Sequence, residues 1–311
     1  EILALLMSPG SLTCLVMEQP KRLLPCAPEL GNLAEISRML SCVPPSQREK
    51  LATECCTPKF LEGLQQAFRI AEDMGSKEAL IFLWRIARGV FLLSNHRLTE
   101  RYLRRDVFED IIGMLEYDEG LPESKRVPHR QVLKVQVRFK QVLCFEDAEM
   151  LEKIHFNFRL QYVKDVVLPR VLDDGSFASL TQLVNLNNSI LLTHLQKSDQ
   201  LMQQLFDNLR KQDVQSLHFL QDACRLAKIL PPSQRNMLYD KLVGQQLFSA
   251  LAPFLAAEVP QDAKLGGGAS EAPQPRLLAM EVILLSAISD ASHLRQFLAG
   301  DAKASNELRA E

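Results

Sequence analysis

Residues 57–93, TPKFLEGLQQAFRIAEDMGSKEALIFLWRIARGVFLL, contain two consecutive helical patterns. Thr57 followed by Pro58 is a common helix start, because the hydroxyl caps free backbone N–H groups and proline suits the first turn. An apolar stripe with helical spacing follows and predicts an amphipathic helix on the edge of a core. The stripe consists of Phe60, Leu61, Leu64, Phe68 and Ala71. From Ala79 to Leu93 the pattern is apolar on nearly all sides, so we expect this second helix to be central and buried.

The same periodicity continues along most of the chain, with short polar breaks between segments. Of the 311 residues 13 are Gly and 6% are aromatic, a composition that argues against a β-sandwich or a barrel. Repeated antiparallel pairs of helices are typical of HEAT and armadillo repeats. We therefore predict an all-α protein with an armadillo/HEAT-like α-solenoid architecture.

In several segments the limits or the type of secondary structure must be chosen from the sequence pattern. Residues 130–143 alternate like a strand but also fit a helix, and we predict a helix because the neighbouring segments are helical. We expect single long helices over Ala148–Leu168, ended by Pro169, and over Ser233–Ala257. The sequence from Ser46 to Glu49 has the spacing of a capping box at a helix start.

Composition predicts four parts along the chain. Residues 1–24 form an N-terminal helical lead-in, and residues 25–258 form the armadillo/HEAT-like domain. Residues 259–275 are a flexible linker by their three consecutive Gly and their Pro residues, and residues 276–311 form C-terminal helices. The chain begins with Glu1 rather than Met, so we expect it to be a fragment of a longer protein.

The charge and cysteine content restrict the class of protein. The formal net charge is −2, which excludes a wholly basic nucleic-acid binder, and no apolar run reaches the roughly 18 residues that a membrane span needs. The seven Cys are odd in number and none is in a CxxC pair, so we expect buried free thiols in a reducing compartment.

No motif with a catalytic mechanism occurs in the sequence. Phosphate-binding glycine loops, nucleophile elbows and zinc-binding histidine pairs are all missing. Asp173 and Asp174 precede Gly175, and we interpret them as a helix cap rather than a metal site. We therefore predict no catalytic residues, no cofactor and no metal ligands, and a protein that is not an enzyme.

Two polar features stand out as candidate binding surfaces. The run from Ser124 to Lys140 contains basic residues and no acid, and on a helix Arg130, Lys134 and Arg138 share one face that could meet an acidic partner or phosphates. The alternative is a solvated helix face. The second feature is a stripe of polar and aromatic residues at helical spacing: His155, Arg159, Tyr162 and Val166. It fits a binding surface or a hydrogen-bonded seam between helices, and we favour the seam.

Short motifs in a fixed order resemble the regulatory subunit 3 family of protein phosphatase 4, the Smek or falafel proteins. The matching motifs are Glu29-Leu-Gly-Asn-Leu-Ala-Glu-Ile36, Arg48-Glu-Lys-Leu51, Leu115-Glu-Tyr-Asp118, His129-Arg130, Phe139-Lys140, Ile154-His155, Arg159, Gln161-Tyr162, Asp165 and Leu168-Pro169. Met114 and Glu119 stand where the family has Cys and Pro. The resemblance covers about residues 25–210.

The resemblance implies a non-catalytic armadillo/HEAT-type regulatory or scaffold subunit. Members assemble with the phosphatase 4 catalytic subunit and its regulatory subunit 2, and act on phosphoprotein substrates indirectly, including in the DNA-damage response. We expect a location in the nucleus and cytoplasm, no membrane partner and no nucleic-acid partner. The alternative function is a nucleic-acid or phosphopeptide-binding helical module that uses the basic run 124–140.

We predict partner contacts in the loop after Leu115, in the basic segment and in the polar stripe. Loop residues are free to face a partner, which favours the first of these regions. The predicted contact residues are Glu116, Tyr117, Asp118, His129, Arg130, Lys134, Lys140, His155, Arg159, Gln161, Tyr162 and Asp165.

Overall fold

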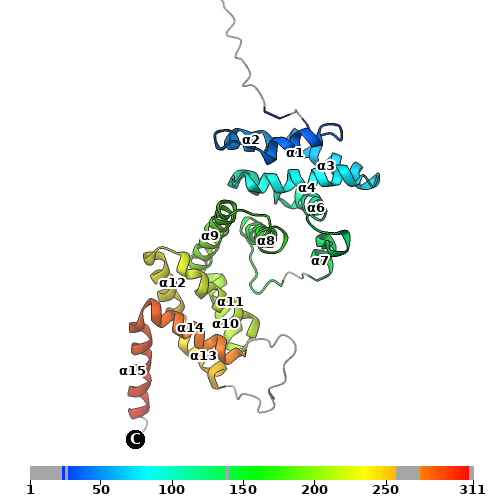
Figure 1. Ribbon diagram of the computed structural model, residues 1–311. Coiled ribbons are helices and arrows are strands. Elements are labelled where there is room, and N and C mark those ends of the chain that lie inside the picture. Colours follow the sequence, from blue (N-terminus) through cyan, green and yellow to red (C-terminus); the bar gives the residue numbers. More distant parts are fainter. Residues whose placement is uncertain (1–22, 25–26, 137–139, 257–273, 308–311) are drawn as a thin grey trace, which may run out of the picture. The chain divides into compact units, whose positions relative to one another are not determined.

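The computed structural model describes residues 23–24, 27–136, 140–256 and 274–307. These residues form fifteen α-helices with short 3-10 and π turns, and no strand among them (Figure 1). The predicted all-α class is therefore confirmed, whereas the solenoid arrangement stays a prediction. The chain divides into two compact units, which are treated separately below. Unit 1 holds the described residues up to Tyr102 and Glu109–Val127; unit 2 holds Leu103–Phe108 and the described residues from Pro128 onward.

Unit 1 is built around one central helix. Its helices are α1 (Leu33–Ser41), α2 (Arg48–Cys55), α3 (Pro58–Asp73), α4 (Lys77–Leu92), α5 (His96–Tyr102) and most of α6 (Arg105–Leu115). Helix α4 contacts α1, α3 and α5, and its Leu83, Ile86 and Phe91 side chains are fully buried. The prediction of a central, buried helix from the apolar pattern after Ala79 is confirmed.

Local chemistry fixes both ends of α3. The Thr57 hydroxyl accepts a hydrogen bond from the Phe60 N–H at 3.4 Å, and all five residues of the predicted stripe are buried. At the other end Gly75 has a φ of 62°, a conformation that costs glycine nothing. The N–H groups of Gly75 and Ser76 bond to the carbonyls of Glu72 and Ala71, which is a Schellman motif.

The predicted capping box at Ser46 is wrong. Ser46 lies in a 3-10 turn, Pro45–Gln47, in which the Gln47 N–H bonds to the Pro44 carbonyl at 2.9 Å. The two prolines fix this turn, so α2 begins only at Arg48, and among the described residues no side chain caps it.

Gly89 on α4 faces Leu40 on α1 at short distance. A Cβ atom at Gly89 would lie 3.0 Å from the Leu40 Cβ, whereas a Cβ at Gly244, in a helix of unit 2, would meet nothing within 4 Å. We expect Gly89→Ala to lower the free energy of unfolding by about 1–2 kcal/mol, because crowding outweighs the gain in helix propensity. Gly244→Ala brings only the gain in helix propensity, without crowding, so it should raise the free energy of unfolding by about 0.5 kcal/mol. Urea denaturation of both variants measures the difference, and equal effects would contradict the close packing.

Unit 2 contains the remaining helices, and most of them share one core. They are α7 (His129–Val135), α8 (Ala148–Tyr162) with a π turn (Val163–Val167), α9 (Asp174–Lys197), α10 (Asp199–Arg210), α11 (Val214–Leu226), α12 (Pro232–Gly244), α13 (Leu247–Ala256), α14 (Pro275–Ser289) and α15 (Ala291–Glu307). Helix α14 follows the predicted linker and packs Leu278 and Val282 into the same core as Phe206 and Leu251. Residues 259–273 of that linker lie outside the described residues.

Three helix predictions in unit 2 need correction. The helix predicted over Ala148–Leu168 is α-helical only to Tyr162 and continues as the π turn Val163–Val167. The helix predicted over residues 130–143 ends at Val135, and residues 140–143 are not helical. Its first turn carries basic residues against the helix dipole, and two of its three apolar residues, Val132 and Val135, are β-branched. Both features disfavour a longer helix. The helix predicted over Ser233–Ala257 is broken into α12 and α13 at Gln246, whose φ is 64°. The break lets Leu247 and Leu251 enter the core.

The described cysteines divide into buried and exposed thiols. Cys55 and Cys224 are buried, Cys56 is half-buried, and Cys42 and Cys144 are exposed, so the expected burial holds for only part of the set. Cys14 and Cys26 lie outside the described residues. Burial raises the pKa of the Cys224 thiol to about 12 and also raises that of Cys55.

This division predicts selective labelling of the native protein. We expect maleimide at pH 8 to modify Cys42 and Cys144 rapidly, because they are accessible. Cys55 and Cys224 should react only after unfolding, because both access and the reactive thiolate are missing. Peptide mapping by mass spectrometry measures the labelling rates of the four cysteines. Equal labelling of Cys224 and Cys144 in native buffer would contradict the burial of Cys224 in the core of unit 2.

Candidate functional site

The predicted contact loop after α6 is fixed by its own side chains. The Tyr117 hydroxyl donates a hydrogen bond to Glu72 Oε1 at 2.8 Å, and its ring packs edge-on against Phe68. Asp118 accepts a hydrogen bond from the Gly120 N–H at 2.8 Å, and its backbone carbonyl accepts one from Arg126 Nε at 3.1 Å. Tyr117 and Asp118 are therefore half-buried parts of unit 1 rather than free loop residues.

Surface ion pairs tie the rest of this loop to α4. Arg85 Nε donates to Glu119 Oε1 at 2.9 Å, and Lys77 Nζ donates to Glu123 Oε1 at 2.8 Å. The hydrogen bond from Arg85 lowers the pKa of Glu119, and that from Lys77 lowers the pKa of Glu123. All four side chains are at least 35% exposed, so these two ion pairs add little to the free energy of unfolding. Their role is to hold the loop in one position against α4.

The polar stripe on α8 points into unit 2 at two of its positions. Tyr162 is 8% exposed and its hydroxyl shares a hydrogen bond of 3.0 Å with Nδ1 of the buried His129 on α7. The two rings meet edge to face, with centroids 5.7 Å apart, and Phe158 lies beside Tyr162 on α8. This geometry supports the interpretation of a hydrogen-bonded seam between α7 and α8.

Arg159 is the second internal member of the stripe. It is 8% exposed, its Nε donates to the Leu103 carbonyl at 2.7 Å, and its guanidinium lies 5.8 Å above the Phe108 ring. It also pairs with Glu152, which is half-exposed. Arg159 therefore joins α8 to the segment Leu103–Phe108 of unit 2, a contact that the sequence pattern did not indicate.

The other predicted contact residues lie at or near the surface. Lys134, Lys140, Gln161 and Asp165 are exposed, while Glu116, Arg130 and His155 are half-buried. Arg130 and Lys134 are one turn apart on α7. Because α7 ends at Val135, Lys140 is not on this helix, and Arg138 lies outside the described residues. Within unit 2 the structure thus brings His129 and Tyr162 together.

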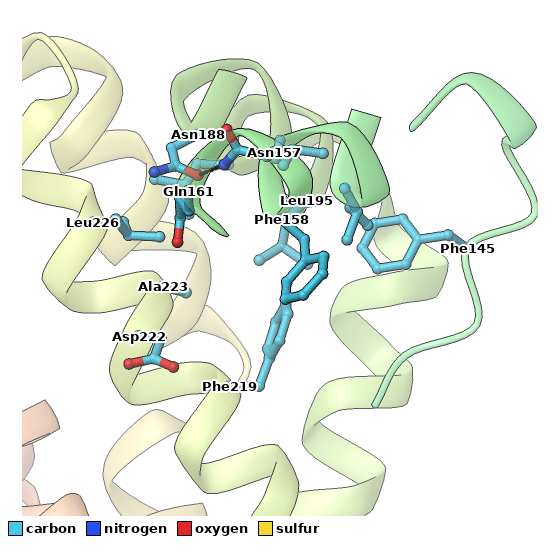
Figure 2. A pocket seen from close by; sticks show the side chains of 13 residues that line it. Phe145, Asn157, Phe158, Gln161, Asn188, Leu195, Phe219, Asp222, Ala223 and Leu226 are labelled. Atoms are coloured by element: carbon cyan, nitrogen blue, oxygen red, sulfur yellow. Dashed lines mark hydrogen bonds between the residues drawn. The ribbon is translucent and has the colours of Figure 1, made fainter. Parts of the chain in front are cut away.

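An apolar groove in unit 2 was not predicted from the sequence. It has a volume of about 290 Å³ and lies between α8, α9, α11 and the loop before α8. Figure 2 shows Phe158 and Phe219 on one side of the groove, Leu226 and Ala223 on the other. Asn157 Nδ2 donates to Asn188 Oδ1 at 2.7 Å in its wall. The signal available in the sequence was the apolar spacing of Ile154 and Phe158, which also fits an ordinary core face.

Among the described residues no group of three or more His, Cys, Asp and Glu side chains could hold a metal ion. In the same part of the chain no single helix is long and apolar enough to cross a membrane. Helices α14 and α15 pass that test only together, as a pair bent by 114°. Asp173 caps α9, as predicted, because its carboxylate accepts a hydrogen bond of 2.7 Å from the Ser176 N–H.

Comparison with known proteins identifies the family. The family model described as phosphatase 4 regulatory subunit 3 matches residues 32–309. The chain belongs to this family. The match extends well beyond Pro169, the last residue of the quoted motifs, and includes α9 to α15, so the relationship covers both units.

Curated relatives support the membership in this family. The chain is 30% identical over 277 residues to Suppressor of Mek1 from Dictyostelium discoideum, covering 86% of this chain and 25% of that protein. It is 29% identical over 245 residues to serine/threonine-protein phosphatase 4 regulatory subunit 3 from Drosophila melanogaster, covering 75% of this chain and 24% of that protein. The chain thus spans about a quarter of the length of these two relatives. No solved structure matches the chain.

Proposed function

We propose that this chain is a non-catalytic scaffold within a phosphatase 4 complex, which docks the catalytic core and helps to target it to substrates. The observation that carries the proposal is the match of the regulatory subunit 3 family over residues 32–309. The second relative is itself described as a phosphatase 4 regulatory subunit. Tethering raises the local concentration of an enzyme near its substrate without new chemistry.

The proposed partners are the phosphatase 4 catalytic subunit and regulatory subunit 2. Phosphoprotein substrates would be met indirectly, through the docked enzyme, in the nucleus and cytoplasm and in the DNA-damage response. The proposed scaffold has an armadillo/HEAT-like α-solenoid arrangement. Short helices that pack on their sequence neighbours, as α8 packs on α9 and α13 on α14, are compatible with such an arrangement.

A pull-down with purified proteins tests the docking role. The immobilised chain is offered the catalytic subunit alone, and then together with regulatory subunit 2, at low and physiological salt. We expect retention of the catalytic subunit in at least one arrangement at physiological salt. Failure in every arrangement would contradict the proposal for this part of the protein.

The basic face of α7 is the surface that we propose for an acidic partner. Arg130 and Lys134 lie one turn apart on α7, and both side chains carry a positive charge. The double variant Arg130→Glu and Lys134→Glu should weaken retention at low salt while the melting temperature stays unchanged. A matched reversal of Lys211 and Lys228, which are exposed elsewhere in unit 2, should leave retention as it is. An unfolded Arg130/Lys134 variant would mean that these residues are structural.

A further inference from the structure

We propose that the groove between α8, α9 and α11 binds an extended peptide segment of a partner protein. The segment would place one large apolar side chain among the phenylalanines, with a Lys or Arg close to it in sequence. This site lies apart from α7 and does not depend on which phosphatase subunit the chain docks. Three properties of the groove carry the inference: its apolar surface, its size and its charge.

The groove keeps large apolar side chains in contact with solvent. Phe158 is 40% exposed, and Phe145 and Phe219 are only half-buried. Phe145 is held in place by stacking on His194, with centroids 6.3 Å apart. Exposed apolar surface that is concave and fixed in position favours binding, because a ligand removes it from water without having to order it first.

The size of the groove favours a side chain over a cofactor. Its volume is about 290 Å³, at the lower end of the roughly 300–1,000 Å³ that small-molecule pockets span. One aromatic or long aliphatic side chain, with part of its backbone, fits such a space. The amides of Asn157, Asn188 and Gln161 lie near one another along the wall (Figure 2). Amide groups can bond to the free backbone of an extended segment, whereas a helix has already paired its own.

The charge of the groove selects the flanking residue. Among the described side chains that line it, Asp222 is the one that carries a charge, and it is exposed. Arg225 is the nearest cation on α11, but it is held by Glu281 at 2.6 Å and 2.7 Å and lies 3.9 Å from Asp222. The carboxylate of Asp222 therefore favours a Lys or Arg beside the apolar anchor.

Selection from a random dodecapeptide library displayed on phage tests this site with the intact chain. We expect an enriched pool whose members share a large apolar residue with a Lys or Arg within about three positions. A synthetic peptide of that consensus should bind Phe158→Ser at least about tenfold more weakly, because the anchor contact is lost. Gln161→Trp is a second blocking variant that keeps Phe158, and it should have a similar effect without removing buried packing.

A matched pair of charge reversals tests the role of Asp222. Asp222→Lys should weaken the peptide about threefold or more, with a smaller effect at high salt. Asp207→Lys is the control, because Asp207 likewise precedes an arginine by three residues on its helix and lies outside the groove lining. Equal effects of the two reversals would contradict the charge argument.

The remaining outcomes would overturn the proposal. They are a library without enrichment, an acidic consensus, or a peptide that binds Phe158→Ser and Gln161→Trp as well as it binds the parent chain. Size-exclusion chromatography is run alongside. A dimer that Phe158→Ser converts to a monomer would assign the groove to a second copy of the chain and would likewise reject a peptide partner. None of these results depends on the phosphatase pull-down, so the two proposals fail separately.

Discussion

Replacing Tyr162 by alanine is expected to lower the free energy of unfolding by about 2–4 kcal/mol, the range for large-to-small changes in a core. The side chain is 8% exposed, and its removal leaves a space between α7 and α8 and takes away the hydrogen-bond partner of His129. Chemical denaturation monitored by circular dichroism measures the loss.

Tyr162→Phe separates the ring from the hydroxyl. It keeps the edge-to-face contact and removes the hydrogen bond, so we expect a loss of only about 1 kcal/mol. Combining it with His129→Ala should give less than the sum of the two single effects, because both remove the same contact. A normal melting temperature for Tyr162→Ala, together with lost partner binding, would show that Tyr162 is a contact residue and not a seam residue.

Arg159→Ala is expected to cost about 2–3 kcal/mol of stability. The change leaves the Leu103 carbonyl without its 2.7 Å hydrogen bond and removes the guanidinium from the Phe108 ring. Glu152 is half-exposed and can be solvated in the variant, so it adds little to the loss. Thermal unfolding measures the effect.

Arg225 is a matched control for the buried arginine. It makes two hydrogen bonds to Glu281, at 2.6 Å and 2.7 Å, but its side chain is 51% exposed. Arg225→Ala should therefore cost less than about 1 kcal/mol, because water replaces the lost bonds. If both variants lost the same stability, the burial of Arg159 would not be what makes it important.

Local sequence chemistry predicted much of the fold. The cap at Thr57, the stripe from Phe60 to Ala71 and the cap of α9 at Asp173 depend on residues close in sequence, and each is observed. The errors arose where the helical periodicity of the sequence was not the deciding feature. At Ser46 the prolines impose a 3-10 turn, and at Gln246 a residue other than glycine takes a positive φ because the following helix is drawn into the core.

The candidate site was predictable only in part. Spacing along α8 placed Arg159 and Tyr162 on one stripe, but whether such a stripe faces solvent or a neighbouring helix depends on contacts far apart in sequence. The Tyr162 partner is 33 residues away and the Arg159 partner is 56 residues away. The groove combines Phe145, Phe158 and Phe219 from three separate segments, so no local motif could indicate it.

The most direct test of the central claim is a titration of labelled phosphatase 4 catalytic subunit with the intact chain, with and without regulatory subunit 2, followed by fluorescence anisotropy. The account predicts saturable binding at physiological salt in at least one of the two titrations, without any phosphatase activity from the chain alone. The absence of saturable binding in both titrations would contradict the proposed scaffold function.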